Sequence, residues 1–106
     1  MQIETIRAVE NIAEIAAVDG VDALFVGPGD LAASMGLAGQ LSDPRVQDML
    51  VTAVKACQAA GKPAGILAHS EEAALLAREQ GYSYIAISSD FGFLMRTART
   101  VLERVK

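Results

Sequence analysis

The stretch from Val21 to Gly36 constrains the fold more than any other part of the chain. It reads VDALFVGPGDLAASMG, an apolar run that ends in a Gly-Pro-Gly turn followed by Asp30. An apolar run this short, bounded by turn residues, is typical of a buried parallel strand with the turn at its carboxyl end. In α/β folds this end of the strands is where ligands bind, because the loops there expose backbone amides. The stretch therefore predicts a strand whose tip presents Asp30 to a functional site.

Strand-like and helix-like segments alternate along the whole chain. The expected strands cover residues 2–4, 23–26, 63–68 and 84–88. The expected helices start at the Thr5 cap, at Leu31, at the Asp43-Pro44 pair, at the Ser70 cap and at Asp90, which we expect to cap the last one. Repeated βα units favour a parallel sheet with right-handed crossovers. Two architectures fit: an open four-stranded sheet that stands alone, or half of a (β/α)8 barrel.

Several apolar positions are expected to form the core. Cys57 lies on the apolar side of a helical segment, which favours a core role over a nucleophilic one. The last helix should turn five apolar residues inward: Leu94, Ala98, Val101, Leu102 and Val105. Its first turns also carry an apolar cluster that fits either core packing or a contact between subunits, made of Phe91, Phe93, Leu94 and Met95.

Composition narrows the class of protein. The chain has 106 residues, 52% of them hydrophobic, which predicts one small core. Nine basic and thirteen acidic residues give a net charge of −4 without any block of Lys or Arg, so we expect neither nucleic acid nor a membrane surface as a partner. The single cysteine excludes an internal disulfide and suits a reducing compartment. No apolar run reaches the roughly 18 residues of a membrane span, so we expect a cytoplasmic protein.

The candidate chemistry begins with Gln2 and Glu4. Side chains alternate along a strand, so these two share one face while Ile3 points to the other. Glu4 then lies at a carboxyl tip beside Asp30, since neighbouring strands are about 4.8 Å apart. Two carboxylates with room for water and a chelating substrate are typical of an octahedral site for Mg²⁺, Mn²⁺ or Co²⁺. The alternative is that Glu4 is simply solvated and Asp30 is only an N-cap.

Three segments together resemble a known family. They are QIET at residues 2–5, GVDALFVGPGDL at residues 20–31, and Met35-Gly36. They are similar to the carboxyl half of the HpcH/HpaI class II pyruvate aldolases. These lyases split 4-hydroxy-2-oxo acids or 2-keto-3-deoxy sugar acids into pyruvate and an aldehyde through a metal-stabilised enolate. The resemblance runs along essentially the whole chain. It implies that residues 1–106 are one half-barrel segment, strands five to eight of a TIM barrel of about 250 residues, present as a fragment or truncation product.

The resemblance also implies roles for individual residues. Glu4 and Asp30 would bind the divalent metal, Gln2 would contact substrate, and the amides of Gly29 and Asp30 would hold the pyruvate carboxylate. The general base and the cationic group of the family come from the first half of the barrel. We therefore expect no catalytic residue in this chain, which would carry the metal and pyruvate site without cleaving substrate alone. His69 matches no catalytic position of the family, and a structural or surface role is expected for it.

Assembly and two other functions remain open at this point. Two unpaired edge strands favour association, and the resemblance implies a homo-oligomer, a trimer or hexamer if the barrel is complete, with the last helix packed on a neighbour. One alternative is a noncatalytic half-barrel that self-assembles through its exposed sheet edges. The other is a citrate-lyase-type enzyme that acts on acyl-coenzyme A.

Overall fold

A computed structural model describes all residues from 1 to 106. Four parallel strands form one sheet in the order β1-β2-β3-β4. The strands are β1 (Gln2–Ile3), β2 (Leu24–Val26), β3 (Ala64–Ala68) and β4 (Tyr84–Ile87). The helices are α1 (Ile6–Glu10), α2 (Ile12–Ala16), α3 (Pro28–Ser34), α4 (Pro44–Ala59), α5 (Glu71–Gln80) and α6 (Asp90–Val105). Each strand pairs with the next one along the chain. This order is that of a barrel wall, whereas a doubly wound sheet reverses its order at a switch point.

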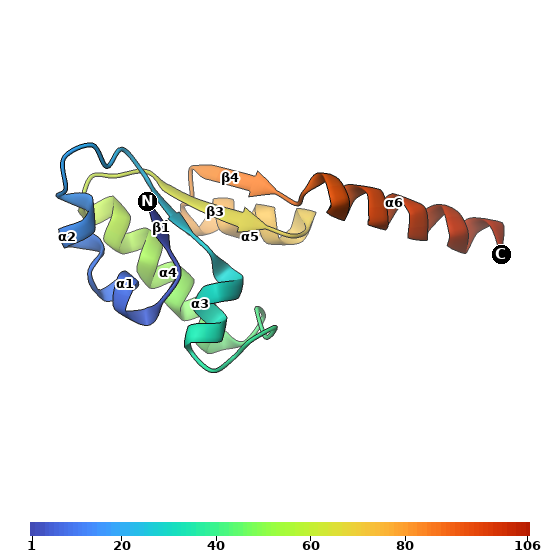
Figure 1. Cartoon of the computed structure of the whole chain (residues 1–106), viewed down its shortest axis with the longest axis horizontal. Helices are drawn as coiled ribbons and strands as arrows, with labels where there is room; N and C mark the ends of the chain where they lie inside the picture. The colour runs from blue at the N-terminus through green and yellow to red at the C-terminus, as the bar shows by residue number, and fades with distance from the viewer.

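Helices cover only one face of this sheet. Figure 1 shows α1, α2, α4 and α5 on one side of the strands, with no helix on the other. The residues of β1, β2 and β3 that point toward the helices are all buried: Ile3, Leu24, Val26, Ala64, Ile66 and Ala68. The edge strand β4 is less covered on this face, since Ile85 is half-buried and Ile87 is 49% exposed. On the opposite face Phe25 is half-buried and Tyr84 is 61% exposed. One covered face and one open face are what half the circumference of a (β/α)8 barrel provides, so the expected half-barrel architecture is confirmed.

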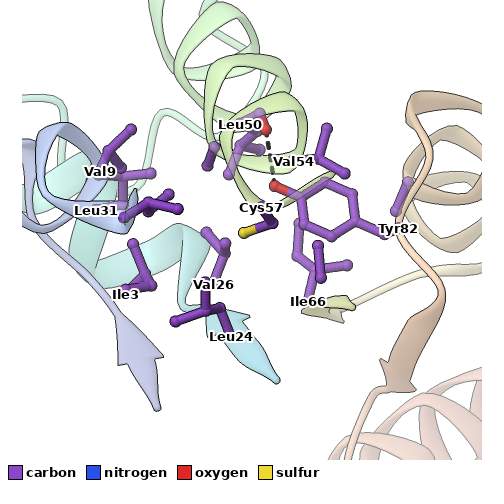
Figure 2. Packing of buried hydrophobic residues seen from close by; sticks show 14 of the residues in the cluster. Ile3, Val9, Leu24, Val26, Leu31, Leu50, Val54, Cys57, Ile66 and Tyr82 are labelled. Carbon is purple, nitrogen blue, oxygen red and sulfur yellow. Dashed lines mark hydrogen bonds between the residues drawn. The ribbon is translucent and has the colours of Figure 1, made fainter. Parts of the chain in front are cut away.

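The core is continuous between the sheet and α4. Figure 2 shows the Tyr82 ring lying against this core, with its hydroxyl donating a 2.8 Å hydrogen bond to the carbonyl of Leu50. Cys57 is fully buried in the same cluster, as expected for a core residue. Burial raises the pKa of the Cys57 thiol, which keeps it protonated and unreactive.

Local sequence signals set most of the helix ends. The side chains of Thr5, Asp43 and Ser70 accept hydrogen bonds from amides in the first turns of α1, α4 and α5, which confirms the three expected caps. The expected cap of the last helix is wrong by one residue. Ser89 caps α6 by accepting a 3.0 Å hydrogen bond from the Gly92 amide, and Asp90 is the first helical residue. The serine hydroxyl reaches that amide while its own backbone remains extended, as an N-cap requires.

Two further boundaries differ from expectation. The first expected helix is interrupted at Asn11 and forms the separate helices α1 and α2. The short helix after β2 begins at Pro28, not at Leu31, because the fixed φ of proline suits the first helical position. Asp30 consequently lies within α3.

The expectation that α6 packs inward is wrong for this chain. Figure 1 shows α6 leaving the sheet at the edge strand β4 and extending away from all the other elements. None of its residues is buried, and the exposed fractions of Leu94 and Val105 are 67% and 72%. Amphipathicity shows that a helix has an apolar side but does not identify the surface that covers it. The aromatic cluster at its start is likewise outside the core, since Phe91 is 68% and Phe93 50% exposed. No helix of the structure is both long and apolar enough to span a membrane.

Candidate metal and substrate site

Glu4 lies directly after β1, and its side chain rests on the end of the neighbouring strand. The Gly27 amide donates a 3.0 Å hydrogen bond to the Ile3 carbonyl, which extends the pairing of β1 and β2 to this point. A Cβ atom built on Gly27 would lie 2.9 Å from Oε1 of Glu4 and 3.0 Å from its Cγ. Glu4 is half-buried as a result. The absence of a side chain at Gly27 therefore creates the space that the Glu4 carboxylate occupies.

Asp30 lies in the first turn of α3, not at the tip of β2. Gly27 is the N-cap of α3 and Asp30 is its third residue, so the alternative that Asp30 is the N-cap is wrong. The position remains favourable for a carboxylate, because the first turn carries the positive end of the helix dipole. The Asp30 side chain is exposed to solvent. Gly27 thus adjoins Glu4 on one side and begins the helix that carries Asp30 on the other.

The chemistry of these donors fits a hard divalent ion. Neither Glu4 nor Asp30 takes part in a side-chain hydrogen bond or an ion pair, so their oxygens are free for another partner. No group of three or more His, Cys, Asp or Glu residues gathers anywhere in the chain, which disfavours a closed zinc-type site. Mg²⁺-type ions are commonly bound by one or two carboxylates with water and substrate completing the shell. Two carboxylates at the open edge of the sheet suit that coordination.

Gln2 lies on the strand that precedes Glu4, and Gly29 lies directly before Asp30 in α3. Gln2 is paired with Phe25. It lies two residues before Glu4, on the same open face of the sheet and further from the strand tip. Gly29 is exposed in the first turn of α3, and nothing lies within 4 Å of a Cβ built on it. The amides of Gly29 and Asp30 have no backbone acceptor, as is usual in the first turn of a helix. These two N–H groups are available to a ligand.

Other polar residues that follow the strands lie apart from Glu4. His69 is exposed after β3 and lines a cavity of about 90 Å³ between α4 and α5. Ser88, Ser89 and Asp90 follow β4, which is separated from β1 by two strands. A larger cavity of about 410 Å³ lies between α5, β4 and α6. Neither cavity is lined by Glu4 or Asp30, so neither encloses the candidate site.

Sequence reasoning missed two residues that shape this region. The steric role of Gly27 could have been inferred, because the strand register places it opposite Glu4. The second residue, Ser34, gave no signal in the sequence. Its hydroxyl accepts a 3.3 Å hydrogen bond from the Ile6 amide and donates one of 2.8 Å to the Leu31 carbonyl. It therefore links the chain after Glu4 to the helix that carries Asp30.

Comparisons with known proteins agree with this fold. Residues 1–97 match the family described as HpcH/HpaI aldolase/citrate lyase. A 2-dehydro-3,6-dideoxy-6-sulfogluconate aldolase from Pseudomonas putida is 43% identical over 106 residues, which are 100% of this chain and 42% of that protein. A hydroxypyruvate/pyruvate aldolase from Delftia acidovorans is 45% identical over 106 residues, which are 100% of this chain and 39% of that protein.

A solved structure shows the same arrangement in three dimensions. An HpcH/HpaI aldolase/citrate lyase family protein from Burkholderia cenocepacia superposes with a TM-score of 0.92 at 42% identity, over 98% of this chain and 40% of that one. The chain thus spans about two fifths of the length of these relatives, and its strands form half of a barrel. With the family pattern matched along residues 1–97 of 106, the chain belongs to the HpcH/HpaI aldolase/citrate lyase family.

Proposed function

We propose that this chain is the metal- and pyruvate-binding half of a class II aldolase, corresponding to strands five to eight of the barrel. The parent enzyme would cleave 4-hydroxy-2-oxo acids or 2-keto-3-deoxy sugar acids into pyruvate and an aldehyde. The observation that carries the proposal is the placement of the Glu4 carboxylate over Gly27, where the helix that holds Asp30 begins. The two curated relatives described above, both aldolases by name, support the reaction class.

In this proposal each group has one task, and Asp30 contributes two groups, its carboxylate and its amide. Glu4 and Asp30 hold Mg²⁺, Mn²⁺ or Co²⁺, which when bound supplies Lewis-acid stabilisation of the negative charge that develops as the carbon–carbon bond breaks. The amides of Gly29 and Asp30 donate hydrogen bonds to the carboxylate of pyruvate. Gln2, on the same face as Glu4, donates its side-chain amide to the substrate and fixes its orientation.

The chain alone should bind these ligands without cleaving substrate. Cleavage also needs a general base, whose loss typically costs about 10²–10⁴-fold in rate. His69 is the only histidine of the chain and lies after β3, two strands from Glu4. We infer that the base lies in the part of the barrel that precedes these strands.

We further propose that the protein works as a homo-oligomer in the cytoplasm, with no nucleic acid or membrane partner. The support is the exposed apolar side of α6 together with the free edges of β1 and β4. A citrate-lyase-type reaction on acyl-coenzyme A is the alternative within the same family, because the family description includes both activities.

The metal site is tested by titrating the chain with Mn²⁺ and following free Mn²⁺ by electron paramagnetic resonance. Wild-type chain should bind weakly, while Asp30→Asn and Glu4→Gln should abolish binding. Asp48→Asn is the matched control, since it removes the same charge from an exposed position on α4. Equal binding by wild type and Asp30→Asn would remove the metal site from the proposal.

The reaction is tested in a barrel restored by adding a matching amino-terminal half. Pyruvate should be released from a 4-hydroxy-2-oxo acid only with a divalent ion, and EDTA should stop the release. The methyl protons of pyruvate should also exchange with solvent deuterium. A restored, metal-loaded barrel that does neither would contradict the aldolase proposal, and release from acyl-coenzyme A instead would favour the alternative.

A further inference from the structure

Glu4 and Asp30 lie on two sides of a closed ring of backbone and hydrogen bonds. One end of the ring is the 3.0 Å bond from the Gly27 amide to the Ile3 carbonyl. From there one side of the ring runs along the backbone from Ile3 through Glu4 to Ile6. The other side runs from Gly27 along α3 through Asp30 to Ser34. The ring closes at Ser34, whose hydroxyl accepts from the Ile6 amide at 3.3 Å.

Ser34 closes the ring because the Ile6 amide has no nearer partner. Ile6 is the first residue of α1, where an amide has no intrahelical acceptor. The hydroxyl of the Thr5 cap is already engaged by the Ala8 amide at 3.0 Å. Ser34 therefore satisfies the Ile6 amide from 28 residues away in sequence.

The hydroxyl of Ser34 is also fixed from the other side. It donates a 2.8 Å hydrogen bond to the Leu31 carbonyl, one residue after Asp30. The hydroxyls of Thr52 and Thr100 make the comparable bond to a preceding carbonyl of their own helices, at 2.8 and 3.0 Å, but neither accepts from another element. Only Ser34 joins the segments that carry the two carboxylates through a side chain.

We propose that Ser34 is a positioning residue for the metal site, holding the Glu4 segment at a fixed place relative to the Asp30 helix. The inference rests on the proposed function, because it assigns Ser34 a role only if Glu4 and Asp30 share an ion. Two carboxylates on separate segments bind a shared ion more strongly when their separation is fixed before the ion arrives. Loss of a group that orients metal ligands typically lowers metal affinity about 10–100-fold.

A matched pair of substitutions separates the hydroxyl from the shape of the side chain. Ser34→Thr keeps the hydroxyl, whereas Ser34→Val has nearly the same shape as threonine without it. With Mn²⁺ as the probe, the valine variant should bind about ten-fold more weakly than wild type. The threonine variant should bind within about two-fold of wild type. Amide hydrogen exchange at Ile6 should accelerate in the valine variant alone.

A control shows whether a lost helix hydroxyl has the same effect elsewhere. Thr52→Val removes a hydroxyl of similar geometry from α4, which carries neither Glu4 nor Asp30, and should leave Mn²⁺ affinity unchanged. Urea unfolding of each variant reports any general loss of stability separately.

The outcomes distinguish this inference from the proposed function. If wild type binds Mn²⁺, Asp30→Asn does not, and the threonine and valine variants bind alike, the role of Ser34 is wrong while the metal site stands. If wild type and Asp30→Asn bind Mn²⁺ equally, the metal site itself is wrong and the role of Ser34 falls with it. If the valine variant loses affinity but Ile6 exchange is unchanged, Ser34 does not act through the Ile6 amide and the inference is overturned.

Discussion

Glu4 and Gly27 share a space that only one side chain can fill. A Cβ on Gly27 would lie 2.9 Å from Oε1 of Glu4. Cγ of Glu4 would lie 3.0 Å away as well, so the side chain must rotate from its Cγ outward, which a flexible, half-buried side chain does at little energetic cost. The backbone of Gly27, with φ −97° and ψ 95°, also accepts an ordinary residue.

The first prediction is therefore a loss of binding without a loss of stability. Gly27→Ala should change the free energy of unfolding by less than about 1 kcal/mol, because only the flexible side chain of Glu4 and no backbone atom must move. It should weaken Mn²⁺ binding at least about ten-fold, since the carboxylate is displaced from its place. Urea unfolding and Mn²⁺ titration of the same sample check the two parts. Unchanged Mn²⁺ affinity would show that the position of Glu4 over Gly27 is irrelevant to the site.

The second prediction is that Gly65→Ala, unlike Gly27→Ala, lowers the stability of the fold. A Cβ on Gly65 would lie 2.6 Å from Cδ2 of Phe25 and 2.9 Å from Cδ1 of Tyr84, and 3.1 Å from the Tyr84 carbonyl oxygen. These two rings meet edge to face across Gly65, with centroids 5.5 Å apart. Ring and backbone atoms cannot move aside as a carboxylate can, so the substitution should cost about 1–3 kcal/mol of stability. Urea unfolding measures this cost, and a neutral result would mean that the aromatic pair is loosely held.

The sequence predicted the helices and strands better than the contacts between them. The caps at Thr5, Asp43 and Ser70 depend on a side chain and an amide two or three residues away, so local sequence contains the whole interaction. The Gly-Pro-Gly turn satisfied two local rules at once, as a turn and as a helix start, and only the fold selected the second. This is why Asp30 was expected at the strand tip and lies in α3 instead.

The remaining errors concern contacts between distant segments. The bond between Ser34 and Ile6 spans 28 residues, and a serine at the end of a helix looks the same in sequence with or without it. The sequence showed that α6 has an apolar side. It did not show that this side lies outside the core, because an amphipathic pattern does not identify the surface that packs against it.

The third prediction concerns alkaline pH. Burial, and to a smaller extent the nearby Cys57 thiol, raises the pKa of Tyr82 above its ordinary value. Folding therefore favours the neutral phenol, so its contribution to stability is complete below the unfolded-state pKa of about 10 and is lost as the pH rises above it. The free energy of unfolding should fall between about pH 9.5 and 11.

Two tyrosine variants isolate this contribution. Tyr82→Phe should reduce the alkaline decrease and, by removing the bond to the Leu50 carbonyl, cost about 1 kcal/mol at neutral pH. Tyr84→Phe, which removes an exposed hydroxyl, should keep the wild-type pH dependence. Unfolding curves in urea across this pH range are the measurement. The same slope in wild type and Tyr82→Phe would contradict the argument.

The fourth prediction concerns association through α6. Burying an exposed leucine side chain contributes about 1.5–3 kcal/mol, so replacing Leu94 and Leu102 together by glutamate should weaken self-association about 100-fold or more. Thr97→Glu and Thr100→Glu together are the matched control, because they add the same two charges at exposed positions outside the apolar side of the helix. Sedimentation velocity over a range of concentrations measures the effect. A wild-type chain that stays monomeric at high concentration would instead favour a half-barrel that is stable alone.

Because α6 is exposed along its whole length, its helical structure depends on contacts with another molecule or another part of the protein. It has 16 residues and no buried side chain, and an isolated helix of that length is marginal in water. Whatever surface covers its apolar side therefore also sets its helix content. In dilute solution this end of the chain should fray first and be the first cut by proteases, and it should become resistant once covered. Resistance to limited proteolysis beyond Ser89 would then report the formation of the contact itself.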